Sequence, residues 1–396
     1  MGCSVITDQE VRSVLLAMSS LPSFGASRLK RVLEAGDPLV DWERLLAGEV
    51  PDHIAATDVM RRQWRDQARR IDPLALAAKH EAAGVTVSID GDEHHPVSRS
   101  VDPSTGNDPY MPPLLFWRGD DASGLRPEQP RVGIIGTRRA SRYGFDIARE
   151  FGRELAHLGI TVVSGLASGI DAAGHRGALD SGATPVVAVI GCGLDVVYPK
   201  SNRQLYGDVA SGGVVLSEYP LGTEPASWRF PARNRILAAL SHVLVVVESH
   251  DSGGSLITAG IAGGWGIPVL AVPGAIRSEG SRGANKLIAD GCQPCLGVDD
   301  ILDALTLVGL NVDSSPKPPS VEKGLGREDE LGERERTVLT AIGWERCSLD
   351  QILGGCAEVG MGGVATALAV LQQRGIVTNT DGLYEQLSHS DRLSPR

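Results

Sequence analysis

Residues 132–175 have the sequence VGIIGTRRASRYGFDIAREFGRELAHLGITVVSGLASGIDAAGH, and this stretch indicates the fold of the largest part of the chain. Two apolar runs, 132–136 and 159–163, have the composition of buried strands, and residues 143–158 between them have a helical pattern. Each run ends in a loop of small residues before a helix. Because backbone N–H groups at the start of a helix have no partner within it, both loops favour an anion.

The alternation of strands and helices continues from residue 130 to residue 310. The apolar runs are continuous in Val and Ile, which is typical of strands that are covered on both faces. We therefore expect an α/β domain with an extended Rossmann-like, mostly parallel sheet and helices on both sides. Ligands of such sheets bind at the carboxyl ends of the strands. The expected strands are residues 132–135, 161–163, 185–190, 213–216, 243–247 and 268–271.

The segments on either side of this alternation have different patterns. Residues 1–75 are expected to form a helical domain, in which two helices around a Gly-containing turn resemble half of a helix-hairpin-helix or SAM-like module. A plain helical packing domain is favoured over such a module. The sheet domain is expected over residues 76–310. Residues 311–330 are rich in Pro, Ser and charge, and they predict a linker.

Residues 331–390 are expected to form a small second domain. Three helical segments precede two short strands around an Asp381-Gly382 turn, which is the layout of a winged helix. The third helix, residues 362–374, has basic charge only at Arg374. Direct reading of DNA bases by this helix is therefore not favoured, and a protein-contact or packing role is at least as well supported.

Composition limits the classes of function. The 396 residues have a formal net charge of −11, which argues against a nonspecific nucleic-acid binder unless basic side chains gather in a local groove. Aromatic residues make up 4% of the chain, so contact with nucleic acid should depend mainly on phosphates. No apolar run reaches the roughly 20 residues that cross a bilayer, and no secretory signal is recognised. We expect a cytoplasmic protein without membrane contact.

The cysteines do not indicate a metal site. Six are scattered along the chain, and Cys292 and Cys295 form the only CxxC pair. A structural zinc ion needs four ligands, and no second pair is close in the sequence. We therefore expect reduced thiols, with no metal and no other cofactor.

Five polar loops at the expected strand ends contain the candidate binding residues. Arg138 could place its guanidinium on a phosphate, with a surface ion pair as the alternative. Lys200 is a candidate point charge for a second phosphate. Arginines around Phe230 suit a single-stranded backbone with an occasional stacked base. The Gly/Ser loop at residues 252–255 adds hydroxyls and backbone amides as phosphate ligands.

Catalysis is not indicated by these loops. Asp171 and His175 are four residues apart and have the types of an acid–base dyad, but a local helix pair is favoured. The sequence shows no metal-ligand cluster and no nucleophile with an obvious adjacent base. This pattern favours a binding surface over a catalytic pocket.

Taken in order, the motifs of these loops resemble the DNA-processing protein DprA (Smf) family. The match is dense over residues 130–290, and the two flanking segments fit the family's flanking modules loosely. The matching residues are Gly136-Thr137-Arg138 with Ser141 and Tyr143-Gly144; Ser164-Gly165-Leu166-Ala167 with Gly169-Ile170-Asp171 and His175; Gly191-Cys192-Gly193-Leu194-Asp195 with Tyr198-Pro199; Ser217-Glu218-Tyr219-Pro220; Phe230-Pro231 with Arg233-Asn234-Arg235-Ile236; Ser255-Leu256-Ile257-Thr258-Ala259; Pro273-Gly274; and Gly283 with Asn285 and Leu287-Ile288.

The resemblance implies a Rossmann-type domain that binds single-stranded DNA, forms a homodimer and loads the RecA recombinase during natural transformation. It also implies that Arg138 and Lys200 contact DNA phosphates, and it implies no catalytic residue. The full set of DNA-binding residues that we predict is Arg138, Arg139, Ser164, Gly165, Lys200, Arg229, Phe230, Arg233, Asn234, Arg235, Ser255 and Thr258.

Two functions of different classes remain open. The favoured one is a non-enzymatic single-strand binder that protects incoming DNA and loads the recombinase. The alternative is a Rossmann-like nucleotide-processing enzyme, similar to nucleoside monophosphate phosphoribohydrolases, but Gly260 stands where those enzymes have their catalytic glutamate. A dinucleotide-dependent dehydrogenase is weaker still, because Gly133, Gly136 and Arg138 do not form a Gly-x-Gly-x-x-Gly pattern.

Overall fold

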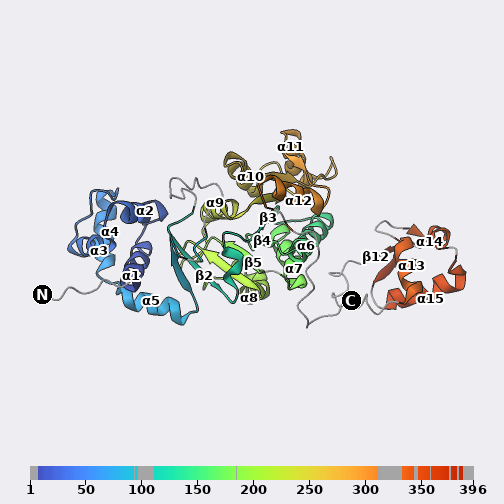
Figure 1. Ribbon diagram of the computed structural model, residues 1–396, viewed down its shortest axis with the longest axis horizontal. Coiled ribbons are helices and arrows are strands. Elements are labelled where there is room, and N and C mark those ends of the chain that lie inside the picture. Colours follow the sequence, from blue (N-terminus) through green and yellow to red (C-terminus); the bar gives the residue numbers. More distant parts are fainter. Residues whose placement is uncertain are drawn as a thin grey trace. The chain divides into compact units, whose positions relative to one another are not determined.

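One nine-stranded sheet lies at the centre of the first unit of the chain (Figure 1). This computed structural model describes residues 8–92, 94–96, 111–183, 185–310, 312, 332–342, 347–356, 358–373, 376–380 and 383–386. They belong to two units, Met1–Ser320 and Val321–Arg396. The strands of the first sheet, in spatial order, are β1 (Thr86–Ile89), β2 (Leu114–Gly119), β6 (Gly213–Ser217), β5 (Val186–Ile190), β4 (Thr161–Ser164), β3 (Arg131–Ile135), β7 (Val243–Val246), β8 (Val269–Ala271) and β9 (Gln293–Pro294).

The sheet is parallel from β6 to β9 and antiparallel where β2 pairs with β1 and with β6. This confirms the predicted mostly parallel, Rossmann-like sheet. All residues of β3 to β7 are buried, as expected of strands with helices on both faces. The sequence does not predict β9, because its two residues are exposed and show no apolar pattern.

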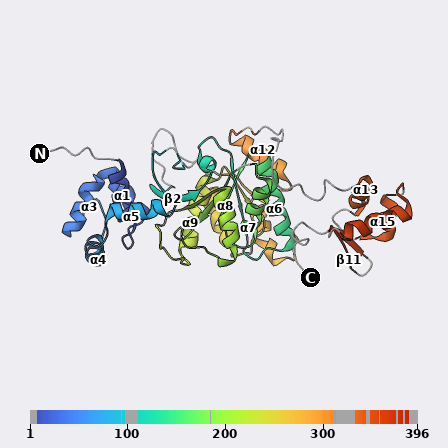
Figure 2. The same cartoon turned by 90° about the horizontal axis from the view of Figure 1, so that it is seen from below.

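Alternate side chains of each strand enter two separate cores, one on each face of the sheet. In β3, Val132 and Ile134 belong to the first core and Ile135 belongs to the second. Helices α6 and α7 lie side by side over the first core (Figure 2). The first face is covered by α6 (Arg142–His157), α7 (Ile170–Ser181), α8 (Arg203–Ser211) and α12 (Val298–Leu307), and the second by α9 (Arg229–Leu240), α10 (Gly254–Gly264) and α11 (Arg282–Ala289). The short helices η1 (Ala122–Leu125), η2 (Lys200–Asn202) and η3 (Glu279–Ser281) lie in the connections.

From residue 8 onward, where the described chain begins, five helices precede the sheet and belong to the same unit. Trp64 is fully buried among them, and its indole N–H donates to the Pro22 carbonyl oxygen at 2.7 Å. The last helix extends beyond residue 75 and packs against the first helix and β1, while His80 accepts the Leu221 amide at 3.2 Å. The domain boundary at residue 75 and the SAM-like assignment stay predictions. The helices are α1 (Asp8–Ser19), α2 (Ala26–Ala35), α3 (Pro38–Ala47), α4 (Asp58–Ala68) and α5 (Pro73–Ala82).

The described part of the second unit has three helices and a three-stranded antiparallel sheet in the order β10-β12-β11. The predicted linker, except residue 312, and the Asp381-Gly382 turn lie outside the described residues. The winged-helix assignment stays a prediction. In the described chain no single helix is long and apolar enough to span a membrane, and the bent pair α14–α15 passes that test only jointly, by length and composition. The elements are α13 (Glu333–Ile342), β10 (Cys347–Ser348), α14 (Leu349–Gly355), α15 (Gly360–Gln373), β11 (Val377–Thr380) and β12 (Leu383–Gln386).

Candidate functional site

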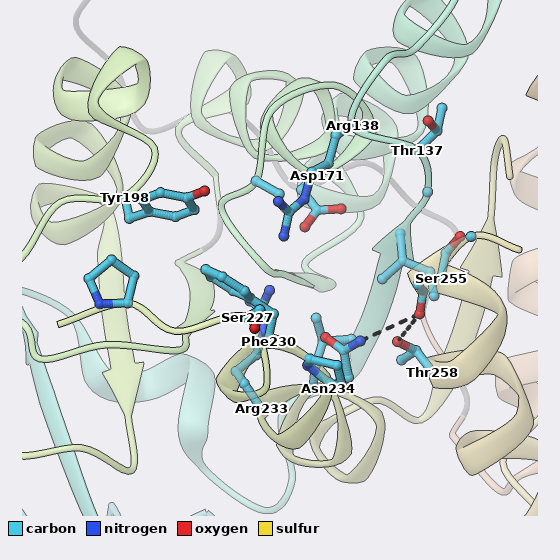
Figure 3. A pocket seen from close by; sticks show the side chains of 18 of the residues that line it. Thr137, Arg138, Asp171, Tyr198, Ser227, Phe230, Arg233, Asn234, Ser255 and Thr258 are labelled. Carbon is cyan, nitrogen blue, oxygen red and sulfur yellow. Dashed lines mark hydrogen bonds between the residues drawn. The ribbon is translucent and has the colours of Figure 1, made fainter. Parts of the chain in front are cut away.

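A cavity of about 560 Å³ opens at the carboxyl edge of the parallel sheet (Figure 3). Its walls come from segments that are far apart in the sequence: the loops after β3, β4, β5, β6 and β7, helix α9 and the start of α10. Parallel strands bring these loops to the same edge of the sheet. The position of the cavity therefore agrees with the predicted ligand edge.

Arg138 places a positive charge at this cavity. The residue is exposed, and its guanidinium carbon lies 5.0 Å from the centre of the Phe230 ring. The Tyr198 ring lies 5.2 Å from the same ring, and Figure 3 shows these side chains around one part of the cavity. Gly169, with a φ of +78°, allows the Arg138 backbone to approach it closely. The fold thus presents a cation and two aromatic rings together.

The start of α10 forms the opposite wall. Within the described chain no side chain caps this helix, so its first backbone N–H groups can attract an anion. Asn234 Nδ2 and Thr258 Oγ1 both donate to the Gly254 carbonyl oxygen, at 3.5 and 3.4 Å, as the dashed lines in Figure 3 show. Ser255 Oγ donates to the Ser249 hydroxyl at 2.8 Å. These hydrogen bonds fix the conformation of this wall.

Arg233 and Asp171 form a buried pair of opposite charges in the floor of the cavity. They are 4% and 7% exposed, and Arg233 Nη1 donates to the Val189 carbonyl oxygen. They meet beside Gly165, where a Cβ would come under 3.0 Å from both side chains. Burial raises the pKa of Asp171 and the Arg233 charge opposes this, whereas burial lowers the pKa of Arg233 and Asp171 opposes it. The pair supports the cavity from below.

His175 makes the stability of the first unit depend on pH. Burial on α7 lowers its pKa to about 3, while the backbone of Ser164 opposes the shift. In the unfolded chain the imidazole has a pKa of about 6.5. The unfolded state therefore binds the extra proton between these values, and stability falls as the pH falls from about 6.5 towards 3.

His175→Gln should make this dependence shallower. Each titrating proton contributes about 1.4 kcal/mol per pH unit to the free energy of unfolding, so we expect the slope between about pH 6 and pH 4 to decrease by that amount. Urea denaturation of the variant and the wild type at several pH values measures it. The comparison uses slopes, so a change in stability at neutral pH does not affect it. Equal slopes in the two proteins would contradict the prediction.

Half of the predicted DNA-binding residues line the cavity. Ser164 does not, because it is fully buried and its hydroxyl donates to the Ile134 carbonyl oxygen at 2.6 Å. Gly165 is also buried and belongs to the floor. The side chain of Ser164 therefore cannot reach a bound strand. The residues that do line the cavity are Arg138, Phe230, Arg233, Asn234, Ser255 and Thr258.

The other four predicted residues are outside the lining. Arg139 and Lys200 are exposed, and Lys200 begins η2. Arg229 lies against two aromatic side chains. Arg235 is partly buried and forms an ion pair with Glu218. The arginine-rich segment therefore does not act as one basic surface, because its members have different neighbours.

Several residues of the site are absent from the predicted set. Tyr198 and His250 line the cavity, and His250 lies in the loop after β7. In the same loop Glu248 is 2% exposed and accepts the Ser141 amide at 2.9 Å and the Ser141 hydroxyl at 2.6 Å, so it holds the residue that caps the start of α6. Its carbonyl oxygen accepts the Thr137 amide at 2.8 Å. A charged residue directly after a buried strand is the sequence pattern from which this loop could have been identified as part of the site.

The described residues do not include a group of three or more His, Cys, Asp and Glu side chains that could hold a metal ion. In the CxxC pair, burial raises the pKa of the Cys295 thiol to about 12 and also raises that of Cys292. Both thiols are therefore protonated near neutral pH, and metal binding or thiolate chemistry is not favoured.

Comparison with known proteins gives consistent matches. A family model described as DNA recombination-mediator protein A matches residues 93–306. Protein Smf of Synechocystis sp. is 33% identical over 303 residues, which are 70% of this chain and 75% of that protein. The putative DNA processing protein DprA of Mycobacterium tuberculosis is 33% identical over 368 residues, 91% of this chain and 90% of that protein. The X-ray structure of DNA processing protein A from Streptococcus pneumoniae superposes with a TM-score of 0.61 at 32% identity, covering 75% of this chain and 98% of that one.

Proposed function

This chain belongs to the DNA recombination-mediator protein A family, and we propose that it binds single-stranded DNA at the cavity on the carboxyl edge of its sheet. Arg138 supports this most directly, because it is an exposed cation held over the Phe230 ring at the cavity. A guanidinium can bind a phosphate through two parallel hydrogen bonds, and an aromatic face beside it can stack an unpaired base.

Two features of the cavity suit phosphate groups. Arg138 offers its guanidinium on one wall, and the start of α10 offers backbone N–H groups on the other. The whole chain has a net charge of −11, so its attraction for a polyanion has to be local. Arg139 and Lys200, exposed near this edge of the sheet, add to the local positive charge.

The aromatic side chains favour a single strand over a duplex. Phe230 and Tyr198 line the cavity, and a ring can stack only on a base that is not already paired and stacked. A volume of about 560 Å³ is that of a small-ligand site. The cavity would therefore accept one nucleotide of a strand, with its neighbours passing over the surface.

We infer binding rather than catalysis. Among the described residues that line the cavity, Asp171 is the only carboxylate and His250 the only imidazole; Arg233 lies beside Asp171 in the floor, and His250 lies in the separate loop after β7. Hydrolysis of a nucleotide needs a general acid or base that reaches the substrate. Gly260, on α10, is the residue at the position of the glutamate in the phosphoribohydrolases that the sequence resembles distantly.

The family resemblance extends the proposal to a cellular role. We propose a cytoplasmic homodimer that protects incoming single strands and loads the RecA recombinase on them during natural transformation. The family's description as a recombination mediator supports this role.

Binding assays with single- and double-stranded oligonucleotides of one sequence, over a range of salt concentrations, test the proposal. We expect tighter binding of the single strand, weak dependence on sequence, and a slope of log affinity against log salt of about −0.7 for each phosphate contacted. A RecA strand-exchange assay on DNA coated with single-strand-binding protein tests the loading step. Equal affinity for both DNA forms, or release of base from nucleoside monophosphates, would contradict the proposal.

A further inference from the structure

Trp228 is an exposed aromatic residue next to the cavity. The residue is 61% exposed, more than Tyr143 at 47% and Tyr198 at 41%. It is the N-cap residue of α9, between the lining residues Ser227 and Phe230 that Figure 3 labels. An exposed indole beside a cavity offers a ring face that a planar ligand can contact.

Arg229 and Tyr219 hold the indole in place from behind. The Arg229 guanidinium carbon lies 4.9 Å from the centre of the Trp228 ring and 5.1 Å from that of the Tyr219 ring. The two rings are perpendicular, with centres 6.4 Å apart. Arg229 also donates to the Glu224 carbonyl oxygen, and its buried Nε has no hydrogen-bond partner among the described residues. We call Tyr219, Trp228 and Arg229 the Trp228 platform.

We infer that the Trp228 platform is a second subsite, which stacks one unpaired nucleobase of the strand whose phosphate lies in the cavity. The inference rests on the proposed single-strand binding and adds a base site that is distinct from the cavity. An exposed indole face can stack on any base, because every base has an aromatic face. Arg229 covers one face of the ring, so the base would stack on the other face, and the guanidinium adds a positive charge to the platform.

The position of the Trp228 platform explains how one strand can occupy the cavity and the platform together. Trp228 and Phe230 are two residues apart at the start of α9, and Phe230 already has Arg138 over its ring. A base inside the cavity and its neighbour on Trp228 would be consecutive or nearly consecutive nucleotides. The subsite requires unpaired bases, so it increases the preference for single strands without reading their sequence.

Oligonucleotides with and without bases separate this subsite from the phosphate contacts. The full chain would be titrated into a fluorescent thymidine oligonucleotide and into the same backbone with abasic positions. We expect the wild type to prefer the oligonucleotide with bases, and Trp228→Ala to reduce the ratio of the two affinities about tenfold, since stacking on one base contributes on the order of 1.4 kcal/mol. Trp228→Phe should retain most of the ratio. Tyr143→Ala, which removes an exposed aromatic residue outside the cavity lining, should leave it unchanged.

The outcomes distinguish this inference from the proposed function. If Trp228→Ala keeps the wild-type ratio while Arg138→Ala weakens binding of both oligonucleotides, the base subsite is wrong and single-strand binding stands. The exposed indole would then serve another partner, such as a protein. If the wild type binds neither oligonucleotide, the proposed function and the subsite both fail. A tenfold smaller ratio in Trp228→Ala, with recovery in Trp228→Phe, supports both.

Discussion

We expect Arg233→Met to lower the free energy of unfolding of the first unit by about 3–5 kcal/mol. Arg233 is 4% exposed, so its guanidinium charge is stabilised by the protein and not by water. Removing it leaves Asp171, 7% exposed, as a buried carboxylate without its positive neighbour. It also removes the donor to the Val189 carbonyl oxygen. Removing one member of a buried charge pair lowers folding stability far more than removing one member of a surface pair does.

Two further variants identify the cause of that loss. Arg139→Met, at an exposed arginine, should change the free energy of unfolding by less than about 0.5 kcal/mol. Combining Arg233→Met with Asp171→Leu should recover part of the lost stability, because no uncompensated charge then remains. Urea denaturation followed by tryptophan fluorescence measures all three. If Arg233→Met is no more destabilising than Arg139→Met, Arg233 is not a buried support of the cavity floor.

The sequence predicts the sheet in more detail than the site, for a physical reason. Strands β3 to β7 are buried on both faces, so their continuous Val and Ile runs identify them. The order of the strands depends on pairings between distant residues, such as Val132 with Val243, and composition does not encode these. The antiparallel pairing of Phe116 with Ser217 at the other side of the sheet is of the same kind.

Only half of the predicted binding residues line the cavity, because the sequence does not show the direction in which a side chain points. Arg229, Arg233 and Arg235 have the same chemistry, but only Arg233 points into the floor, since it lies on the side of α9 that contacts β5. Ser164 is the last residue of a buried strand, and its hydroxyl satisfies the Ile134 carbonyl oxygen. The sequence favours a helix pair of Asp171 with His175, whereas the charge that acts on Asp171 most strongly is that of Arg233. Such neighbours are set by tertiary packing.

Arg138→Ala should reduce the affinity for single-stranded DNA by at least about tenfold and should leave stability unchanged, since the residue is exposed. Loss of one phosphate contact should also make the slope of log affinity against log salt shallower by about 0.7. Arg138→Lys should keep that slope, because the charge remains, but should bind more weakly than the wild type, since a lysine cannot form the guanidinium fork or stack over Phe230 in the same way. Fluorescence anisotropy at several salt concentrations measures both quantities.

Two surface variants test whether a basic residue that lines the cavity contributes more to DNA affinity than basic residues outside it. Arg153→Ala removes an exposed arginine on α6, outside the cavity lining, and should change neither affinity nor salt slope. Lys200→Ala should have a smaller effect than Arg138→Ala, because Lys200 is exposed on η2 and is not part of the lining. Equal losses from Lys200→Ala and Arg138→Ala would mean that the strand follows η2 as closely as it follows the loop after β3. Undiminished binding by Arg138→Ala would contradict the assignment of the cavity as the DNA site, because no other exposed guanidinium in the described chain lines it.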